Sequence, residues 1–75
     1  MSDFVTHRGM DCLVVPGVSK TKVNRLYGHA RRYSLIFDKV AEPSPSRSYT
    51  LYFPVLKAGH DATRKVVEGL FKVVS

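Results

Sequence analysis

In two stretches near the middle of the chain the odd-numbered positions are apolar, a pattern typical of half-buried β-strands. Their apolar residues occupy odd-numbered positions, namely Tyr33, Leu35 and Phe37 in the first stretch and Tyr49, Leu51, Phe53 and Val55 in the second. The segment 41–47 between them is rich in proline and serine, which favours a flexible hairpin loop. We therefore predict antiparallel strands over 33–40 and 48–55. Because Pro54 lacks a backbone donor, we expect an edge position or the end of pairing there.

A run of β-branched residues near the start of the chain predicts a buried strand. Residues 11–15 read Asp-Cys-Leu-Val-Val, and Pro16 and Gly17 follow at once. A proline-glycine pair is expected where a strand ends, so the prediction ends the strand before it. The preceding segment 4–7 is compatible with a hairpin arm that turns through 8–10, although no pattern in the sequence requires it.

The segment after this strand has the spacing of an amphipathic helix. Apolar residues recur at helical intervals, at Val23, Leu26, Tyr27 and Ala30. Ser19 stands where an N-cap is expected, which predicts a helix from about Lys20 to Arg31. Gly28 in its middle costs about 1 kcal/mol relative to alanine, so packing must stabilise this helix.

The C-terminal segment also has helical spacing. Asp61 is a good N-cap, and apolar residues after it share one helical face. These residues are Ala62, Val66, Leu70 and Val73. Gly69 permits an alternative in which the helix ends near Glu68 and residues 70–74 form a last β-strand. The sequence leaves both arrangements open.

These segments predict an α+β fold in a single compact domain over residues 1–75. We expect a small antiparallel sheet of three to four strands, with two helices on one face and the order β-α-β-β-α. A chain of 75 residues has room for one hydrophobic core and no second domain.

The cysteine content and the apolar runs bear on where the protein is expected to act. Cys12 is the only cysteine, so no internal disulfide forms and a reducing compartment is favoured. No apolar run approaches the roughly 20 residues of a membrane-spanning helix. Asp3, Arg8 and Asp11 interrupt any apolar segment of an export signal. We therefore expect no membrane span and a cytoplasmic location, which is the host cytoplasm if the protein is viral.

Positive charge dominates the chain and is concentrated in one segment. Twelve lysines and arginines against six acidic residues give a net charge of +6. No acidic residue occurs from Cys12 to Phe37. In a helix, several cationic side chains of this segment cluster away from the apolar stripe, at Lys22, Arg25, His29 and Arg32. Such a basic ridge is suited to follow a phosphate backbone.

We therefore predict contact with nucleic acid, either RNA or DNA, or with an acidic protein surface. The residues assigned to this contact are Lys20, Lys22, Arg25, Tyr27, His29, Arg31, Arg32 and Arg47. Tyr27 is included because aromatic side chains stack on bases. Arg47 stands at the base of the proline-rich loop, which is either a simple connector or a docking or phosphorylation segment. The alternative for the whole basic face is a solvated helix surface that serves solubility.

No signature of a known RNA-binding module or phosphate-binding loop is present. Tyr49, Tyr52 and Phe53 follow a basic residue, but the segment lacks the glycines and the aromatic spacing of an RNA-recognition motif. Packing in the core is the preferred interpretation of these aromatic residues. The sequence also lacks a GxxG loop, a zinc-finger ligand set and a Gly-Lys-Ser/Thr loop.

Residues that carry catalysis or bind metals are few and scattered. Cys12 lies in an apolar strand, and His7, His29 and His60 form no short ligand pair. We expect a non-enzymatic regulatory protein with no metal and no cofactor. The alternative is a protein-binding inhibitor of the viral or phage type that docks on an acidic groove of a larger complex. A homodimer through an open sheet edge beside Pro54 is a third interpretation.

Overall fold

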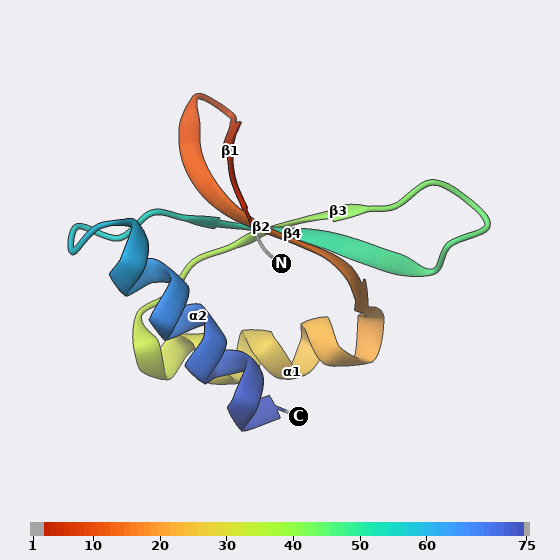
Figure 1. Ribbon diagram of the computed structural model, residues 1–75. Helices are drawn as coiled ribbons and strands as arrows, with labels where there is room; N and C mark the ends of the chain where they lie inside the picture. The colour runs from red at the N-terminus through yellow and green to blue at the C-terminus, as the bar shows by residue number, and fades with distance from the viewer. Residues whose placement is uncertain (1–2, 75) are drawn as a thin grey trace.

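A four-stranded antiparallel sheet lies over two helices in the computed structural model, which describes residues 3–74 (Figure 1). In chain order the elements are β1 (Phe4–His7), β2 (Met10–Ser19), α1 (Lys20–Ala30), the 3₁₀ turn η1 (Arg31–Tyr33), β3 (Asp38–Ala41), β4 (Ser48–Pro54) and α2 (His60–Val74). The spatial strand order is β1-β2-β4-β3, and both helices lie on the same side of the sheet. The predicted α+β class with two helices on one face is therefore confirmed, and the full order is β-β-α-β-β-α.

Strand β2 is longer than the sequence pattern predicted. The pair Pro16 and Gly17 does not end the strand but forms a bulge, where the register against β4 shifts between Val15 and Val18. Gly17 has a φ of 70°, in the left-handed region that favours glycine. Its N–H donates to the Glu42 carboxylate at 2.8 Å instead of to a neighbouring strand. The strand therefore continues past the predicted end.

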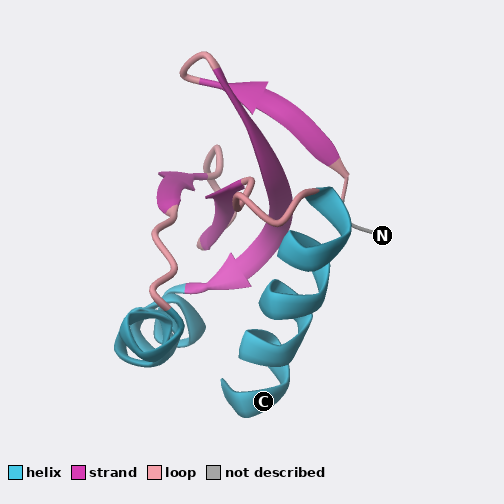
Figure 2. Cartoon of the chain, turned by 90° about the vertical axis from the view of Figure 1, so that its left-hand side faces the viewer, coloured by secondary structure: helices cyan, strands magenta, loops and turns pink. Residues whose placement is uncertain are grey.

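The hairpin arm at 4–7 is confirmed as β1, and the β1–β2 hairpin coils on the side of the sheet away from the helices (Figures 1 and 2). His7 of the edge strand β1 reaches the opposite edge strand, where its Nε2 donates to Asp38 Oδ2 at 2.9 Å. The His7 ring also stacks on Tyr52 of β4, with ring centroids 3.8 Å apart. Side chains therefore join the two edges of the sheet at this end.

Strand β3 is much shorter than predicted, because it begins at Asp38 rather than at Tyr33. Tyr33 lies in η1 with an exposed side chain, and Ser34, with a φ of 55°, turns the chain after it. Leu35 and Phe37 are buried although neither belongs to a strand. The apolar residues at 35 and 37 therefore mark buried positions of an extended segment that is not part of the sheet. Hydrogen-bonded pairing with β4 begins at Asp38.

Strand β4 agrees closely with the strand predicted over 48–55 and lies in the centre of the sheet. The predicted antiparallel pairing with β3 is confirmed, and the loop between them starts one residue late because Ala41 still pairs with Tyr49. Pro54 is the last residue of β4, and pairing with β3 has already stopped at Tyr52. The expected end of pairing is therefore found on the β3 side, whereas on the other side Pro54 still pairs with Cys12 of β2.

Both helices form, and α1 begins where it was predicted. The Ser19 hydroxyl accepts a hydrogen bond from the Lys22 backbone N–H at 3.3 Å, which confirms the N-cap. The α-helix ends at Ala30 and the chain continues into η1. Helix α2 is continuous to its last residue, so the alternative of a β-strand over 70–74 is wrong.

Helix α2 starts earlier than predicted and buries a different face. Asp61 lies in the first turn and is not the N-cap. Thr63 ties the helix start to the preceding loop, because its hydroxyl donates to the Gly59 carbonyl at 2.7 Å and accepts from the Leu56 N–H at 2.8 Å. The buried residues of α2 are Thr63, Val67, Leu70 and Val74. Val73, which was predicted on the apolar face, is 50% exposed.

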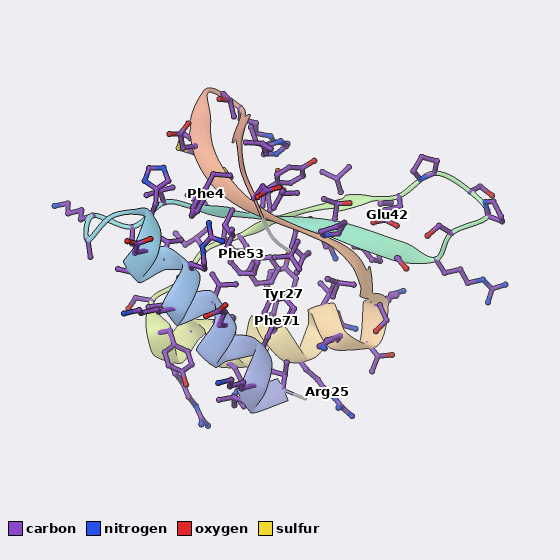
Figure 3. All side chains as sticks on the ribbon, in the orientation of Figure 1. Phe4, Arg25, Tyr27, Glu42, Phe53 and Phe71 are labelled. Atoms are coloured by element: carbon purple, nitrogen blue, oxygen red, sulfur yellow. The ribbon has the colours of Figure 1, made fainter. Side chains whose placement is uncertain are left out.

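The hydrophobic core lies between the sheet and the two helices. Phe53 packs there against Phe37 and Phe71, with ring centroids 4.9 Å and 6.2 Å away (Figure 3). The other buried core residues are Leu13, Val18, Val23, Leu26, Ala30, Leu35, Leu51, Val67, Leu70 and Val74. Within residues 3–74, no helix has the length and apolar character needed to cross a membrane.

Candidate nucleic-acid interface

Helix α1 distributes the predicted binding residues over two sides rather than along one ridge. Lys22 is half-buried, and its Nζ lies 5.5 Å from the centroid of the Phe71 ring in α2. His29, seven residues further along the same side of the helix, is also half-buried. Arg25 is exposed and points away from the sheet (Figure 3), and Arg32 in η1 is exposed as well. Two residues of the predicted ridge, Lys22 and His29, are therefore partly covered, whereas Arg25 and Arg32 are open to solvent.

The remaining predicted residues of α1 and η1 lie on the side that faces β3. Lys20, Tyr27 and Arg31 are seven and four residues apart, which places them on one helical face. The Tyr27 ring packs on Phe37, just before β3, with centroids 4.5 Å apart and an interplanar angle of 20°. Tyr27 nevertheless remains 41% exposed. This face of the helix therefore carries an accessible tyrosine between two cations.

Lys39 of β3 connects this helical face to the sheet. The strand register pairs it with the buried Leu51, so its side chain lies on the helix side of the sheet. Its Nζ lies 5.5 Å from the ring centroid of Tyr27 and 5.5 Å from that of Tyr49. Because β3 is an edge strand, this long side chain stays exposed while it spans two aromatic rings.

We call this surface the tyrosine–lysine strip. It consists of Lys20, Tyr27, Arg31, Lys39, Arg47 and Tyr49. Tyr27 lines a shallow hollow of about 300 Å³, and Tyr49 lines a second one of about 370 Å³. Lys39 contacts one tyrosine of each hollow. An open, elongated surface of this kind suits an extended ligand better than an enclosed small molecule.

The strip combines unpaired cations with a carboxylate that is occupied by other donors. Within residues 3–74, none of its four cations forms an ion pair. Glu42 borders the second hollow, but it accepts hydrogen bonds from Gly17 N at 2.8 Å, Thr50 Oγ1 at 2.9 Å and Ser46 Oγ at 3.2 Å. These bonds, that from Gly17 foremost, lower the pKa of Glu42. The carboxylate thereby fixes the base of the loop that carries Arg47.

The face of the sheet away from the helices carries a second cluster of charged and aromatic side chains, which we call the hairpin latch. It consists of His7, Arg8, Asp38 and Tyr52. The Arg8 Nε lies 3.4 Å from the Asp38 oxygen that accepts from His7. The hydrogen bond from His7 and, less strongly, the charge of Arg8 lower the pKa of Asp38. The Asp38 carboxylate is therefore held by both His7 and Arg8 within the latch.

Cys12 lies beside the latch with the environment of a packing residue. Its side chain is 1% exposed, and its Sγ donates to the Met10 carbonyl at 3.6 Å. Burial and then the nearby Asp11 and Asp38 raise the pKa of the Cys12 thiol, which disfavours the nucleophilic thiolate. Within residues 3–74, no three His, Cys, Asp or Glu side chains converge as metal ligands would.

Two residues of the strip were not among those predicted to bind. The sequence pattern assigns Tyr49 to the core, and it does pack there, but it also contacts Lys39. Lys39 itself carried a signal, because it continues the odd-numbered series of Leu35 and Phe37. A lysine at a position expected to face the core indicates a cation held over apolar or aromatic groups.

Comparison with known proteins assigns no relative to this chain. No protein-family model, curated protein or solved structure matches it significantly. The functional argument therefore depends on the surfaces described above.

Proposed function

We propose that the protein is a non-enzymatic regulatory protein that binds nucleic acid through the tyrosine–lysine strip. The observation that carries the proposal is Lys39, which contacts two tyrosines and lies among cations that form no ion pair within residues 3–74. Four cations on one surface, with no ion-pair partner among the described residues, attract a polyanion, and accessible aromatic rings distinguish this surface from a merely solvated one.

The physical basis of the affinity is neutralisation of phosphates. Each lysine or arginine that contacts a phosphate releases condensed counterions, so binding weakens as salt is added. The net charge of +6 adds long-range attraction. Arg25 and Arg32 contribute to this field from the solvent side of α1 and η1, whereas Lys22 and His29 are partly withdrawn against the protein.

The proposal is tested by fluorescence-anisotropy titration of short labelled RNA, single-stranded DNA and duplex DNA at several salt concentrations. We expect dissociation constants in the micromolar range or tighter at low salt. The logarithm of the affinity should fall with the logarithm of salt by about 0.7 per phosphate contact for a single strand.

Two double variants with the same net charge distinguish the contribution of the strip to binding from that of the overall charge. The double variant Arg31→Gln/Lys39→Gln should bind about tenfold more weakly or worse, because two contacts are lost. Lys57→Gln/Lys65→Gln has the same net charge but changes exposed residues before and within α2, outside the strip, and should bind nearly as well as the parent. Equal losses in both variants would contradict the strip. If no polymer binds at low salt, the proposal fails and an acidic protein groove becomes the better candidate partner.

A further inference from the structure

We infer that the tyrosine–lysine strip binds a single strand, whose unpaired bases stack on Tyr27 and Tyr49 while Lys39 moves from the rings to a phosphate. This inference rests on the proposed function and adds the class of ligand, a phosphodiester strand with exposed base faces.

The spacing of the two tyrosines fits neighbouring nucleotides. Each ring centroid lies 5.5 Å from the same Lys39 Nζ, so the centroids are separated by at most twice that distance. Stacked nucleotides rise about 3.4 Å along a strand, so bases up to about three positions apart reach both rings. A strand that occupies both hollows would place its backbone beside the strip cations at either end, Arg31 and Arg47.

Lys39 keeps the platform covered when no strand is bound. An ammonium over an exposed ring gains a modest cation–π attraction, whereas a base stacked on an aromatic side chain gains more. A base that displaces Lys39 also brings a phosphate for the released ammonium. The tyrosine rings therefore become available to the bases when the Lys39 ammonium moves to a phosphate.

A duplex does not offer this arrangement. Its base faces are covered by stacking within the helix, so only its phosphates would meet the protein. Arg25 and Arg32, which are exposed and lie outside the strip, would be the natural contacts of such a rigid rod. If substitutions in the strip weaken binding, the bound polymer is a single strand. If substitutions of Arg25 and Arg32 weaken it instead, the bound polymer is a duplex.

The test uses the intrinsic fluorescence of the protein, which has four tyrosines and no tryptophan. Short oligo-uridylate, oligo-thymidylate, duplex DNA and inorganic polyphosphate are titrated into the full chain. We expect quenching of tyrosine fluorescence by both single strands and about tenfold tighter binding of one or both than of duplex or polyphosphate. Tighter binding of the RNA would assign a contact to the 2′-hydroxyl, and tighter binding of the DNA would assign the thymine methyl or the deoxyribose.

Variants assign the stacking to particular rings. Tyr27→Leu and Tyr49→Leu should each weaken single-strand binding about fivefold or more and leave polyphosphate binding unchanged. Tyr27→Phe and Tyr49→Phe keep the rings and should bind like the parent, which controls for loss of packing. Tyr33→Leu changes an exposed tyrosine of η1 outside the strip and should have no effect.

Two outcomes separate this inference from the proposed function. If single strands and polyphosphate bind equally, with no quenching and no effect of the leucine variants, base stacking is wrong while phosphate binding stands. If neither nucleic acid nor polyphosphate binds at low salt, both are wrong.

Discussion

The hairpin latch and the tyrosine–lysine strip differ in whether their charged side chains have partners within the protein. In the latch, Asp38 accepts from His7 at 2.9 Å and lies 3.4 Å from Arg8, and the His7 ring covers Tyr52. In the strip, the cations have no carboxylate partner within the described residues, and Lys39 spans two partly exposed tyrosines. The latch uses its charged and aromatic groups to close the sheet, whereas the strip leaves the same kinds of groups open to a ligand.

The contrast indicates which surface of this basic protein is open to a ligand. The net charge alone does not distinguish the two regions, because both contain basic side chains and aromatic rings. What distinguishes them is whether the fold already satisfies those groups. Changes in the latch should therefore alter stability and spare binding, and changes in the strip should do the reverse.

The largest expected effect comes from the core that both regions share. Phe53→Ala removes the ring that packs against Phe37 and Phe71, which should cost about 3–5 kcal/mol of unfolding free energy. A core of this size supplies only a few kcal/mol in net terms, so we expect the variant to unfold and both regions to be lost together. Circular dichroism with urea titration checks this, with the exposed Val40→Ala as the control. A folded Phe53→Ala variant would contradict the packing described here.

The next effect separates the two regions. His7→Ala removes a ring stack and a hydrogen bond to a carboxylate, which should lower the unfolding free energy by about 1–2 kcal/mol. Affinity for a short single strand should change by less than about twofold, because the strip is untouched. His7→Phe keeps the stack alone and should lose less. A His7→Ala variant that binds much more weakly would show that the regions are coupled.

Acid should weaken the fold through Asp38 and Glu42. Both pKa values are lowered in the folded state, by hydrogen bonds from His7 and Gly17 respectively. Their stabilisation is therefore present above the ordinary carboxyl pKa and is lost as the pH falls below about 4. Urea unfolding over an acid series should show a shallower loss in Asp38→Asn and Glu42→Gln than in the parent. Parallel curves for all three proteins would contradict these assignments.

The smallest effect concerns the one carboxylate identified beside the strip within residues 3–74. Glu42→Gln removes a negative charge from the hollow of Lys20 and Arg47 but keeps an acceptor for Gly17. Single-strand affinity should rise about twofold to threefold at low salt and converge with the parent at high salt. Anisotropy titration at two salt concentrations measures this. Weaker binding would instead mean that the negative charge itself is needed to position the loop.

Local patterns predicted several elements because short-range chemistry decides them. Ser19 was identified as an N-cap from its place before an apolar stripe, and its hydroxyl makes the capping bond. The central strand β4 followed from alternation and from Pro54 at its end. The α+β class followed from the order of such segments. None of these depends on a distant residue.

The sequence patterns were wrong where distant contacts decide the structure. Pro16 and Gly17 look like a turn, but the Glu42 carboxylate receives the freed N–H and β2 continues as a bulge. The alternation up to Phe37 predicts a strand, but the partner strand is absent there and only burial remains. A local sequence pattern cannot predict which distant residue will pair with a segment in the folded protein.

The candidate site was predicted only in part for the same reason. Helical spacing correctly separated the charged residues of α1 from its buried stripe, but it could not show that Lys22 lies against α2. Nor could it show that the edge strand β3 delivers Lys39 to Tyr27 and Tyr49. The strip is a tertiary feature to which α1, η1, β3, β4 and the loop before β4 all contribute.

The most direct test of the central claim is an NMR titration of the ¹⁵N-labelled protein with a short single-stranded oligonucleotide. We predict that the largest chemical-shift changes occur along the strip, at Lys20, Tyr27, Arg31, Lys39, Arg47 and Tyr49, while the latch residues His7 and Arg8 remain unmoved. Changes centred on the latch or on α2, or no changes at low salt, would contradict the claim that the strip is the binding surface.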